Sequence, residues 1–215
     1  FADRYRGQRL LVVGLGLSGV SALRYLAAEG ADVTVTDSRA APGGIEALRA
    51  EFAEVPFALG AFAAPQPLAT YDAAVVSPGV DLRDPFITAL QAAGVPILGD
   101  IEVFARAIQA PHAARRTPQV VGITGSNGKS TVTTLVGEMV RAAGQITAVG
   151  GNLGTPALDL LADDVAVYVL ELSSFQLETT HSLRCTAAAF LNLSDDHLDR
   201  HGSMARYGAI KAGIW

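Results

Sequence analysis

The sequence predicts an α/β protein built from two successive parallel-sheet domains. Short runs of β-branched residues alternate with Ala- and Leu-rich helical stretches along almost the whole chain, and this alternation favours right-handed crossovers within a mainly parallel sheet. The alternation is interrupted at APHAARRTPQ (110–119), which has two prolines and two adjacent arginines, a composition typical of a loop. We therefore expect a Rossmann-like domain over residues 1–110 and a second α/β domain, of the phosphate-loop type, over residues 119–215.

The elements of the first domain follow from its residue pattern. Runs of β-branched residues bounded by glycine, proline or aspartate predict strands, and Ala/Leu-rich stretches predict helices. We expect the strands at 9–16, 32–37, 71–79 and 95–98, and the helices at 18–30, 43–53, 85–94 and 100–109.

The second domain restarts the same alternation. A strand at 119–125 leads through a glycine-rich turn into a helix that reaches about residue 141. The stretch ITAVGGNLG (146–154) comes next, followed by an expected helix at 156–162, strands at 165–174 and 184–194, and a helical stretch over 203–215.

Composition excludes several classes of partner. A net charge of −5, a pI near 5.3 and the absence of basic stretches argue against binding to nucleic acid or to an anionic membrane. No apolar run approaches the roughly 20 residues that a membrane span needs. The single cysteine, Cys185, cannot form an internal disulfide, which fits a reducing compartment, and its apolar surroundings predict a packed thiol. We expect a cytoplasmic protein.

The stretch GLGLSG (14–19) predicts a nucleotide site in the first domain, because it follows a strand and opens a helix. Gly14 permits the tight turn, Gly16 lets the backbone approach a pyrophosphate, and Gly19 allows the helix to pack closely on the strand. The helix N-terminus supplies amide groups for the anion. Asp37 ends the second expected strand, where a carboxylate can accept a hydrogen bond from a ribose or a base.

The second domain decides which nucleotide this turn would bind. NAD is favoured by GLGLSG alone, but a reductase has no evident use for a triphosphate loop. A different nucleotide that carries its own pyrophosphate would use the same turn. The stretch SPG (77–79) lies at the carboxyl end of a later strand, where it can line the crevice, although an ordinary proline turn explains it equally well.

The stretch VVGITGSNGKSTVTTL (120–135) predicts a variant phosphate loop. The common pattern has a glycine five positions before Gly128, and this chain has Ile123 there. The chemical parts of the loop are nevertheless present. Gly125, Asn127 and Gly128 allow the backbone to curl around phosphate oxygens. Lys129 adds positive charge, and Ser130 or Thr131 offers a hydroxyl to Mg²⁺.

Acidic residues after the later strands predict a metal site beside this loop. Glu171 ends an apolar strand, where a carboxylate is costly unless a cation or hydrogen-bond donors meet it. Asp195, Asp196 and His197 follow the next strand, and together with the loop they resemble a site for Mg²⁺, which prefers oxygen ligands. Lys211, taken alone, predicts a solvated helix lysine.

These motifs together resemble a known family. GITGSNGKST, GGNLG, LELSSFQLE, LNLSDDHLDRH and YGAIK occur in this order in the Mur ligases, the ATP-dependent amide-bond ligases of peptidoglycan precursor synthesis. In the first domain, GLGLSG, DSR (37–39), SPGV and GDIEVF are similar to the members that add D-glutamate to UDP-N-acetylmuramoyl-L-alanine. The resemblance spans essentially all 215 residues.

The resemblance implies two nucleotide sites, with the UDP part of UDP-N-acetylmuramoyl-L-alanine on the glycine turn and ATP on the phosphate loop. The implied UDP-binding residues are Leu17, Ser18, Asp37, Ser38, Arg39, Ser77 and Gly79. The implied ATP-binding residues are Gly125, Ser126, Asn127, Gly128, Lys129, Ser130 and Thr131. The implied catalytic residues are Lys129, Asn152, Glu171, His197 and Lys211.

The resemblance also implies two Mg²⁺ ions, with Ser130, Glu171, His197 and a carbamylated Lys211 as the metal-linked residues. Addition of CO₂ would convert Lys211 from a cation into a carboxylate-like ligand, and an unmodified lysine binds metals poorly. In the implied reaction the L-alanyl carboxylate takes the γ-phosphoryl group of ATP, and the amine of D-glutamate then displaces phosphate from the acyl phosphate. Asp196 and His197 are both candidates for handling the proton.

Members of the family continue into the rest of the central domain and a third domain, which contributes to ATP and D-glutamate binding. We therefore expect the second domain to be incomplete, and the 215-residue chain to bind the UDP substrate as a monomer without ligating. Three alternatives stay open: a Mur ligase that adds another amino acid, an NAD(P)-binding oxidoreductase or sensor, and a non-catalytic nucleotide-binding scaffold.

Overall fold

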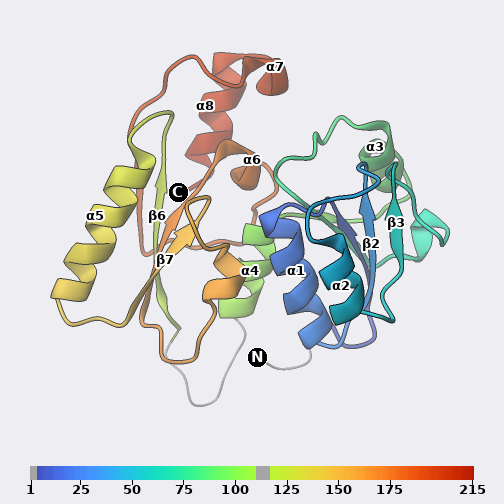
Figure 1. Ribbon diagram of the computed structural model, residues 1–215. Coiled ribbons are helices and arrows are strands. Elements are labelled where there is room, and N and C mark those ends of the chain that lie inside the picture. The colour runs from blue at the N-terminus through green and yellow to red at the C-terminus, as the bar shows by residue number, and fades with distance from the viewer. Residues whose placement is uncertain (1–3, 110–116) are drawn as a thin grey trace. The chain divides into compact units, whose positions relative to one another are not determined.

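The computed structural model describes residues 4–109 and 117–215 (Figure 1). The chain divides into two compact units, Phe1–Asp100 and Ile101–Trp215. Each unit has one sheet, and every strand pair in both sheets is parallel. The predicted α/β class with two successive parallel sheets is therefore confirmed. Most of the stretch that we expected to link the domains, residues 110–116, lies outside the described residues.

The first unit has the strand order β3-β2-β1-β4-β5. The chain leaves β1 toward one side of the sheet and later returns to the other side, so the carboxyl ends of β1 and β4 mark the switch point where α/β sheets bind ligands. The elements are β1 (Arg9–Val13), α1 (Leu17–Ala28), β2 (Asp32–Asp37), α2 (Ile45–Glu51), β3 (Phe57–Leu59), η1 (Leu68–Thr70), β4 (Ala73–Val76), α3 (Pro85–Ala92) and β5 (Ile97–Leu98).

The core of this unit lies on both faces of its sheet. Leu11 and Val13 of β1 pack with Ile87 and Leu90 of α3, all of them buried. Side chains alternate between the two faces of a strand, so Leu10 points to the opposite face, where α1 contacts the sheet. Figure 1 shows α1 and α2 side by side in front of it. Full burial of each of these apolar side chains contributes roughly 1.5–3 kcal/mol.

The second unit has the strand order β7-β8-β6-β9. Its core includes Ile123, Val167 and Val169, against which apolar residues of the helix after β6 pack. The elements are α4 (Asp100–Ile108), β6 (Gln119–Thr124), α5 (Lys129–Ala142), β7 (Thr147–Gly151), η2 (Ala157–Leu160), β8 (Val167–Glu171), α6 (Ser174–Leu177), β9 (Ala187–Phe190), α7 (Leu198–His201) and α8 (Met204–Ala212).

The position of α4 differs from the expected domain boundary. We assigned residues 100–109 to the first domain, whereas from Ile101 onward the chain belongs to the second unit. The buried Glu102 carboxylate accepts hydrogen bonds from the backbone N–H groups of His181 and Ser182, each at 2.8 Å. The Phe104 ring meets the Tyr168 ring edge-on, with 5.1 Å between centroids. These contacts fix α4 to the second unit.

Several short elements differ from the sequence expectation. The three-residue strand β3 (Phe57–Leu59) is additional, and the expected helix at 156–162 is the short 3₁₀ helix η2. The strand expected at 165–174 ends at Glu171, because the chain then turns into α6. Ser173 caps α6 in a reciprocal capping box with Gln176, which satisfies N–H groups that a continuing strand would pair differently.

Gly19 is required by the packing of the first unit. A Cβ at this position would overlap the carbonyl oxygen of Gly14 and lie 2.6 Å from the Ser77 hydroxyl oxygen. We expect Gly19→Ala to destabilise this unit by about 2–3 kcal/mol, because overpacking at that site forces the turn to move. Differential scanning calorimetry measures the effect.

Gly16→Ala is the matched control, since no atom lies within 4 Å of a Cβ placed at Gly16. Its melting temperature should stay close to that of the unchanged chain. Equal melting of the two variants would contradict the packing argument.

Candidate functional site

The glycine turn of the first unit joins the carboxyl ends of three strands. Gly14 follows β1 with φ of 90°, a conformation that favours glycine. Its amide N–H donates to the carbonyl of Thr36 at the end of β2, at 2.8 Å. Its carbonyl accepts from the Ser77 hydroxyl after β4, at 2.7 Å. Ser77 therefore fixes the turn directly, at the switch point of the sheet.

Asp37 holds the other side of the turn. Its Oδ2 accepts from the Leu15 N–H at 2.6 Å and from the Arg39 guanidinium at 2.7 Å. Its Oδ1 accepts from the Arg39 N–H and Nε, both at 2.8 Å. Burial opposes ionisation of this carboxyl, but the hydrogen bonds from Arg39 and Leu15 outweigh it and lower its pKa to about 2. The four bonds use all four lone-pair sites of the carboxylate.

The N-terminus of α1 beside this turn is accessible. Leu17 is 79% exposed and Gly16 is exposed, whereas Ser18 is half-buried. The first N–H groups of a helix have no acceptor within the helix, so they can bind an anion such as a pyrophosphate. Ser38 and Gly79 are exposed after the ends of β2 and β4. The expected UDP-binding residues thus share the carboxyl edge of one sheet.

The phosphate loop of the second unit connects β6 to α5. Gly128 caps α5 in the left-handed conformation, with φ of 79°. The Lys129 ammonium folds back over the loop and donates to the carbonyl of Ser126 at 3.0 Å. Lys129, Ser130 and Thr131 form the first turn of α5, where amide N–H groups have no acceptor within the helix. The loop thus presents a cation and free amides together.

Glu171 forms a compact cluster with two other expected site residues. It is 3% exposed at the end of β8. Its Oε2 accepts from the Ser130 hydroxyl at 2.7 Å, and its Oε1 accepts from the Asn152 amide at 2.8 Å. These are the donors that a buried carboxylate requires. The Glu171 carboxylate at the end of β8 and the Ser130 hydroxyl in the first turn of α5 offer oxygen ligands of the kind that Mg²⁺ prefers.

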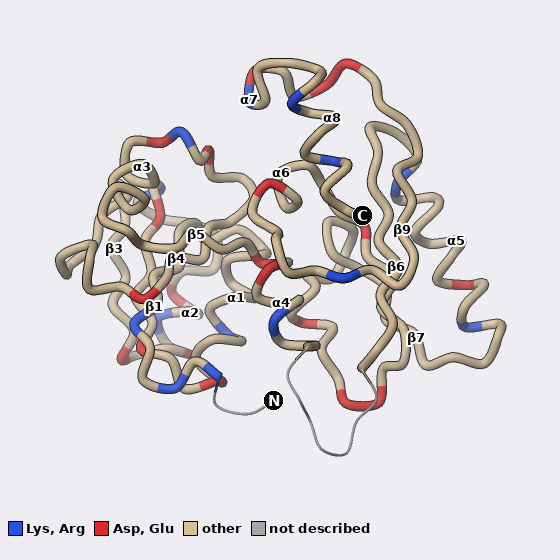
Figure 2. The backbone as a smooth tube through the Cα atoms, turned by 180° about the vertical axis from the view of Figure 1, so that it is seen from behind, with Lys and Arg blue, Asp and Glu red and all other residues tan. Residues whose placement is uncertain are grey.

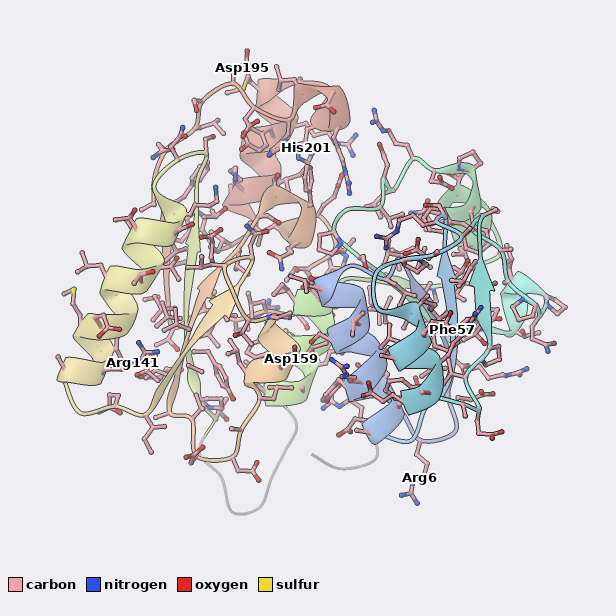
Figure 3. All side chains as sticks on the ribbon, in the orientation of Figure 1. Arg6, Phe57, Arg141, Asp159, Asp195 and His201 are labelled. Atoms are coloured by element: carbon pink, nitrogen blue, oxygen red, sulfur yellow. The ribbon has the colours of Figure 1, made fainter. Side chains whose placement is uncertain are left out.

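In the part of the chain that the structure describes, His197 makes no hydrogen bond or ring contact with these three residues, although its ring lies 6.4 Å from that of Tyr207. It precedes α7 with φ of 52°, pairs with Asp196 at 3.4 Å and packs its ring 4.8 Å from that of Phe175. Within residues 4–109 and 117–215, no three His, Cys, Asp or Glu side chains gather as metal ligands. Figure 3 shows Asp195 at the outer end of the loop that leads into α7. Of the expected site residues, Ser130, Asn152 and Glu171 are therefore the ones linked by hydrogen bonds in this cluster.

Lys211 is buried, and its environment contradicts the solvated helix lysine that the residue alone predicted. The side chain is 1% exposed, and its Nζ donates to the carbonyl of Gly125 in the phosphate loop at 2.9 Å. It lies 4.8 Å above the centre of the Tyr207 ring. Burial, together with the positive charge of Lys129, lowers the pKa of Lys211 to about 8. With this pKa, roughly a tenth of the Lys211 amine is neutral at pH 7, far more than for an ordinary lysine.

Sequence reasoning missed Tyr207, although the motif YGAIK contains it. Its OH lies 3.3 Å from the Ser126 hydroxyl of the phosphate loop, and its ring stacks on His201 at 5.3 Å. His201 is buried among α6, α7 and α8 (Figure 3), and its Nε2 lies 3.0 Å from the Ser174 hydroxyl. The spacing of four residues between Tyr207 and Lys211 was the available signal, because it places both on one helix face.

Charge and thiol chemistry match the sequence expectations. Basic and acidic residues are interspersed over each unit in Figure 2, which fits the absence of basic stretches in the sequence. Burial raises the pKa of the Cys185 thiol to about 11, so it stays protonated at neutral pH, as a packed thiol should. None of the helices among the described residues is both long enough and apolar enough to cross a membrane.

Comparison with known proteins gives two family matches. Residues 8–99 match the Mur ligase MurD-like N-terminal domain, and residues 123–215 match the Mur ligase middle domain. The UDP-N-acetylmuramoylalanine–D-glutamate ligase of Methylobacillus flagellatus is 51% identical over 210 residues, which cover 98% of this chain and 45% of that protein. The enzyme of the same name from Pseudomonas aeruginosa is 51% identical over 214 residues, covering 100% and 45%. The chain thus spans less than half of these relatives' length.

Solved structures show a similar fold at low identity. A UDP-N-acetylmuramate:L-alanyl-gamma-D-glutamyl-meso-diaminopimelate ligase from Neisseria meningitides has a TM-score of 0.55 and 16% identity, over 97% of this chain and 67% of that one. A UDP-N-acetylmuramate-alanine ligase from Thermotoga maritima has a TM-score of 0.54 and 20% identity, over 96% and 46%. At such identities the likeness concerns the fold alone.

The lowered pKa of Lys211 predicts a pH-dependent contribution to stability. Between about pH 8 and the ordinary lysine value of 10.5, the unfolded chain binds more protons at Lys211 than the folded chain does, so the free energy of unfolding should rise with pH. Relative to Lys211→Met, the unchanged chain should gain up to about 3 kcal/mol over this range. Urea unfolding at several pH values in bicarbonate-free buffer measures it. A pH-independent difference between the two proteins would contradict the argument.

Proposed function

Because this chain belongs to the Mur ligase family, we propose that it forms the UDP-substrate-binding and phosphate-binding parts of an ATP-dependent ligase. That enzyme would add D-glutamate to UDP-N-acetylmuramoyl-L-alanine, the reaction in the names of its relatives, and would act in peptidoglycan precursor synthesis. The observation that carries the proposal is the buried Glu171 carboxylate, which accepts hydrogen bonds from Ser130 in the first turn of α5 and from Asn152 just after β7. We further propose that the protein acts as a monomer in the cytoplasm.

The first unit would bind the UDP moiety on the glycine turn. The exposed N-terminus of α1 offers amide groups to the pyrophosphate, and Gly16 leaves open space for its approach. Asp37 and Ser77 act by holding the turn in place. Leu17, Ser18, Ser38, Arg39 and Gly79 lie around the same edge and would make the remaining contacts.

The hydrogen bonds of Asp37 argue against the ribose contact that an NAD site makes with this carboxylate. In a dinucleotide site the corresponding carboxylate accepts from the ribose hydroxyls. Here the Asp37 carboxylate already accepts four hydrogen bonds from Leu15 and Arg39. A ribose hydroxyl would have to displace one of these donors.

The second unit would bind ATP and Mg²⁺. The amides of residues 125–131 and the Lys129 ammonium offset the charge of the triphosphate. Ser130 and Glu171 are the residues that would hold Mg²⁺, and a bound Mg²⁺ would supply charge neutralisation at the transferred phosphoryl group. The Asn152 amide donates to the Glu171 carboxylate and would hold it in place, and the resemblance to the family implies that Asn152 also contacts the substrate and the transferred phosphate.

The proposed reaction has two chemical steps. The L-alanyl carboxylate attacks the γ-phosphorus of ATP, which gives an acyl phosphate and ADP. The amine of D-glutamate then attacks the acyl carbon, an amide forms, and phosphate and a proton leave. Lys129 stabilises the charge that develops on the transferred group. Asp196 and His197, which form a pair at 3.4 Å, are the candidates for receiving the proton.

Carbamylation of Lys211 is a further part of this proposal. A neutral lysine amine attacks CO₂, a nitrogen–carbon bond forms and one proton is released, which leaves an anionic carbamate. The lowered pKa of Lys211 increases the neutral amine that this step needs. The carbamate oxygens would then join Ser130, Glu171 and His197 as the residues that would hold two Mg²⁺ ions.

Two variants test the separate sites. By isothermal titration calorimetry, Lys129→Met should weaken Mg-ATP binding at least about tenfold through loss of a charge-assisted contact, and should leave the affinity for UDP-N-acetylmuramoyl-L-alanine unchanged. Gly16→Ala should weaken the binding of UDP-N-acetylmuramoyl-L-alanine and leave Mg-ATP binding unchanged, because its methyl group would occupy the space of the pyrophosphate.

Loss of both ligands in either variant would contradict two independent sites. Tight NADH binding that UDP does not displace would favour an oxidoreductase instead.

The carbamate can be detected directly, since the sequence has two lysines, Lys129 and Lys211. After incubation with ¹³C-bicarbonate, the NMR spectrum should contain a lysine carbamate signal that Lys211→Met removes and Lys129→Met retains. The amino terminus reacts in all three proteins and serves as an internal reference. A spectrum identical in the two variants would exclude carbamylation of Lys211.

A further inference from the structure

The phosphate loop of this chain is unusually short because its first glycine is replaced. Ile123 stands five positions before Gly128, where the common loop has a glycine and already turns. Here β6 continues through Ile123 to Thr124, and the Ile123 side chain is 1% exposed in the core. Four residues, 125–128, are left to form the loop between β6 and α5.

A second segment, which we call the bracing segment (residues 192–194), holds this short loop from outside. The Asn192 side chain pairs with both backbone groups of Asn127: its Oδ1 accepts from the Asn127 N–H at 2.9 Å, and its Nδ2 donates to the Asn127 carbonyl at 3.0 Å. The Asn192 carbonyl accepts from the Ser126 N–H at 3.0 Å. One residue thus satisfies three backbone groups of the loop.

Ser194 adds contacts to the same two loop residues. Its N–H donates to the Ser126 hydroxyl at 3.0 Å, and its carbonyl accepts from that hydroxyl at 3.2 Å. Its own hydroxyl accepts from the Asn127 side-chain amide at 3.0 Å. The loop also approaches the bracing segment closely, since a Cβ at Gly125 would lie 3.3 Å from the Asn192 nitrogen. Gly125, with φ of 151°, is therefore the residue that permits this approach.

We propose that Asn192 is a positioning residue that completes the phosphate loop, in place of the longer glycine-rich turn that the sequence lacks. A four-residue loop with two glycines would otherwise sample many backbone conformations. Fixing Asn127 from outside leaves the amides at the start of α5 arranged before a triphosphate arrives, which lowers the ordering cost of binding. Asn192 itself contacts the loop and not the ligand.

This inference rests on the proposed binding of ATP at the loop, and its test separates the two. In Asn192→Ala, the Asn127 amide loses its acceptor, so hydrogen–deuterium exchange at residues 126–128 should be faster in the ligand-free chain. Mg-ATP binding should weaken about tenfold, as expected for two lost hydrogen bonds. Ser194→Ala keeps the backbone contacts of the bracing segment and should have a smaller effect on both measurements.

Thr186→Val is the matched control. Thr186 lies just before β9, and its hydroxyl accepts from the Val120 N–H of β6 at 3.3 Å. It therefore links the same two regions of the sheet, but at the end opposite the loop. This variant should lower the melting temperature to a similar degree, with loop exchange and Mg-ATP affinity unchanged.

Three results would be decisive. Normal Mg-ATP affinity in Asn192→Ala would overturn the positioning role. Equal weakening in Thr186→Val would also overturn it, because the effect would then be one of general stability. Failure of the unchanged chain to bind Mg-ATP would contradict the proposed function, and the exchange comparison would still decide whether Asn192 orders the loop.

Discussion

The second unit depends on the buried carboxylate of Glu171. Its charge is tolerated because the Ser130 hydroxyl and the Asn152 amide each donate to one of its oxygens. Those donors come from different elements, so the cluster forms only in one alignment of the sheet, with Glu171 opposite Ile123 of β6 and Gly151 of β7. A slip of one residue would turn the carboxylate to the other face of β8. The register of β8 in the sheet and the hydrogen bonds of Glu171 therefore depend on each other.

Both units place a glycine turn before a helix N-terminus, but different residues hold the turn in each unit. In each, a strand ends in a glycine turn that presents a helix N-terminus to solvent, as anion sites require. The turn of the first unit is supported by side chains from neighbouring strand ends, Asp37 and Ser77. The loop of the second unit is supported by the bracing segment and by Lys211. Both supports come from residues distant in sequence, so the turns are ordered by the tertiary fold.

The sequence allowed the regular elements and the ligand-facing turns to be predicted, because both leave local patterns. The strand at 32–37 has the bounds expected, and the helices after both glycine turns lie where the turns place them. The short elements β3, α6 and α7 have too few residues to show a period. The contacts of α4 could not be predicted, because the Glu102 partners, His181 and Ser182, lie far along the chain. The burial of Lys211 was equally invisible, since it depends on Gly125 and Tyr207.

The helix α8 meets the phosphate loop through Tyr207 and Lys211, which lie one turn apart. Four residues of α-helix rise about 6 Å. This spacing allows Tyr207 to contact Ser126 while Lys211 contacts Gly125. Side-chain changes at the exposed Ala209 leave this spacing unchanged. Inserting a single amino acid would rotate the lysine by about 100° around the axis, away from the loop. The spacing of Tyr207 and Lys211 along α8 therefore matters as much as the identity of the two side chains.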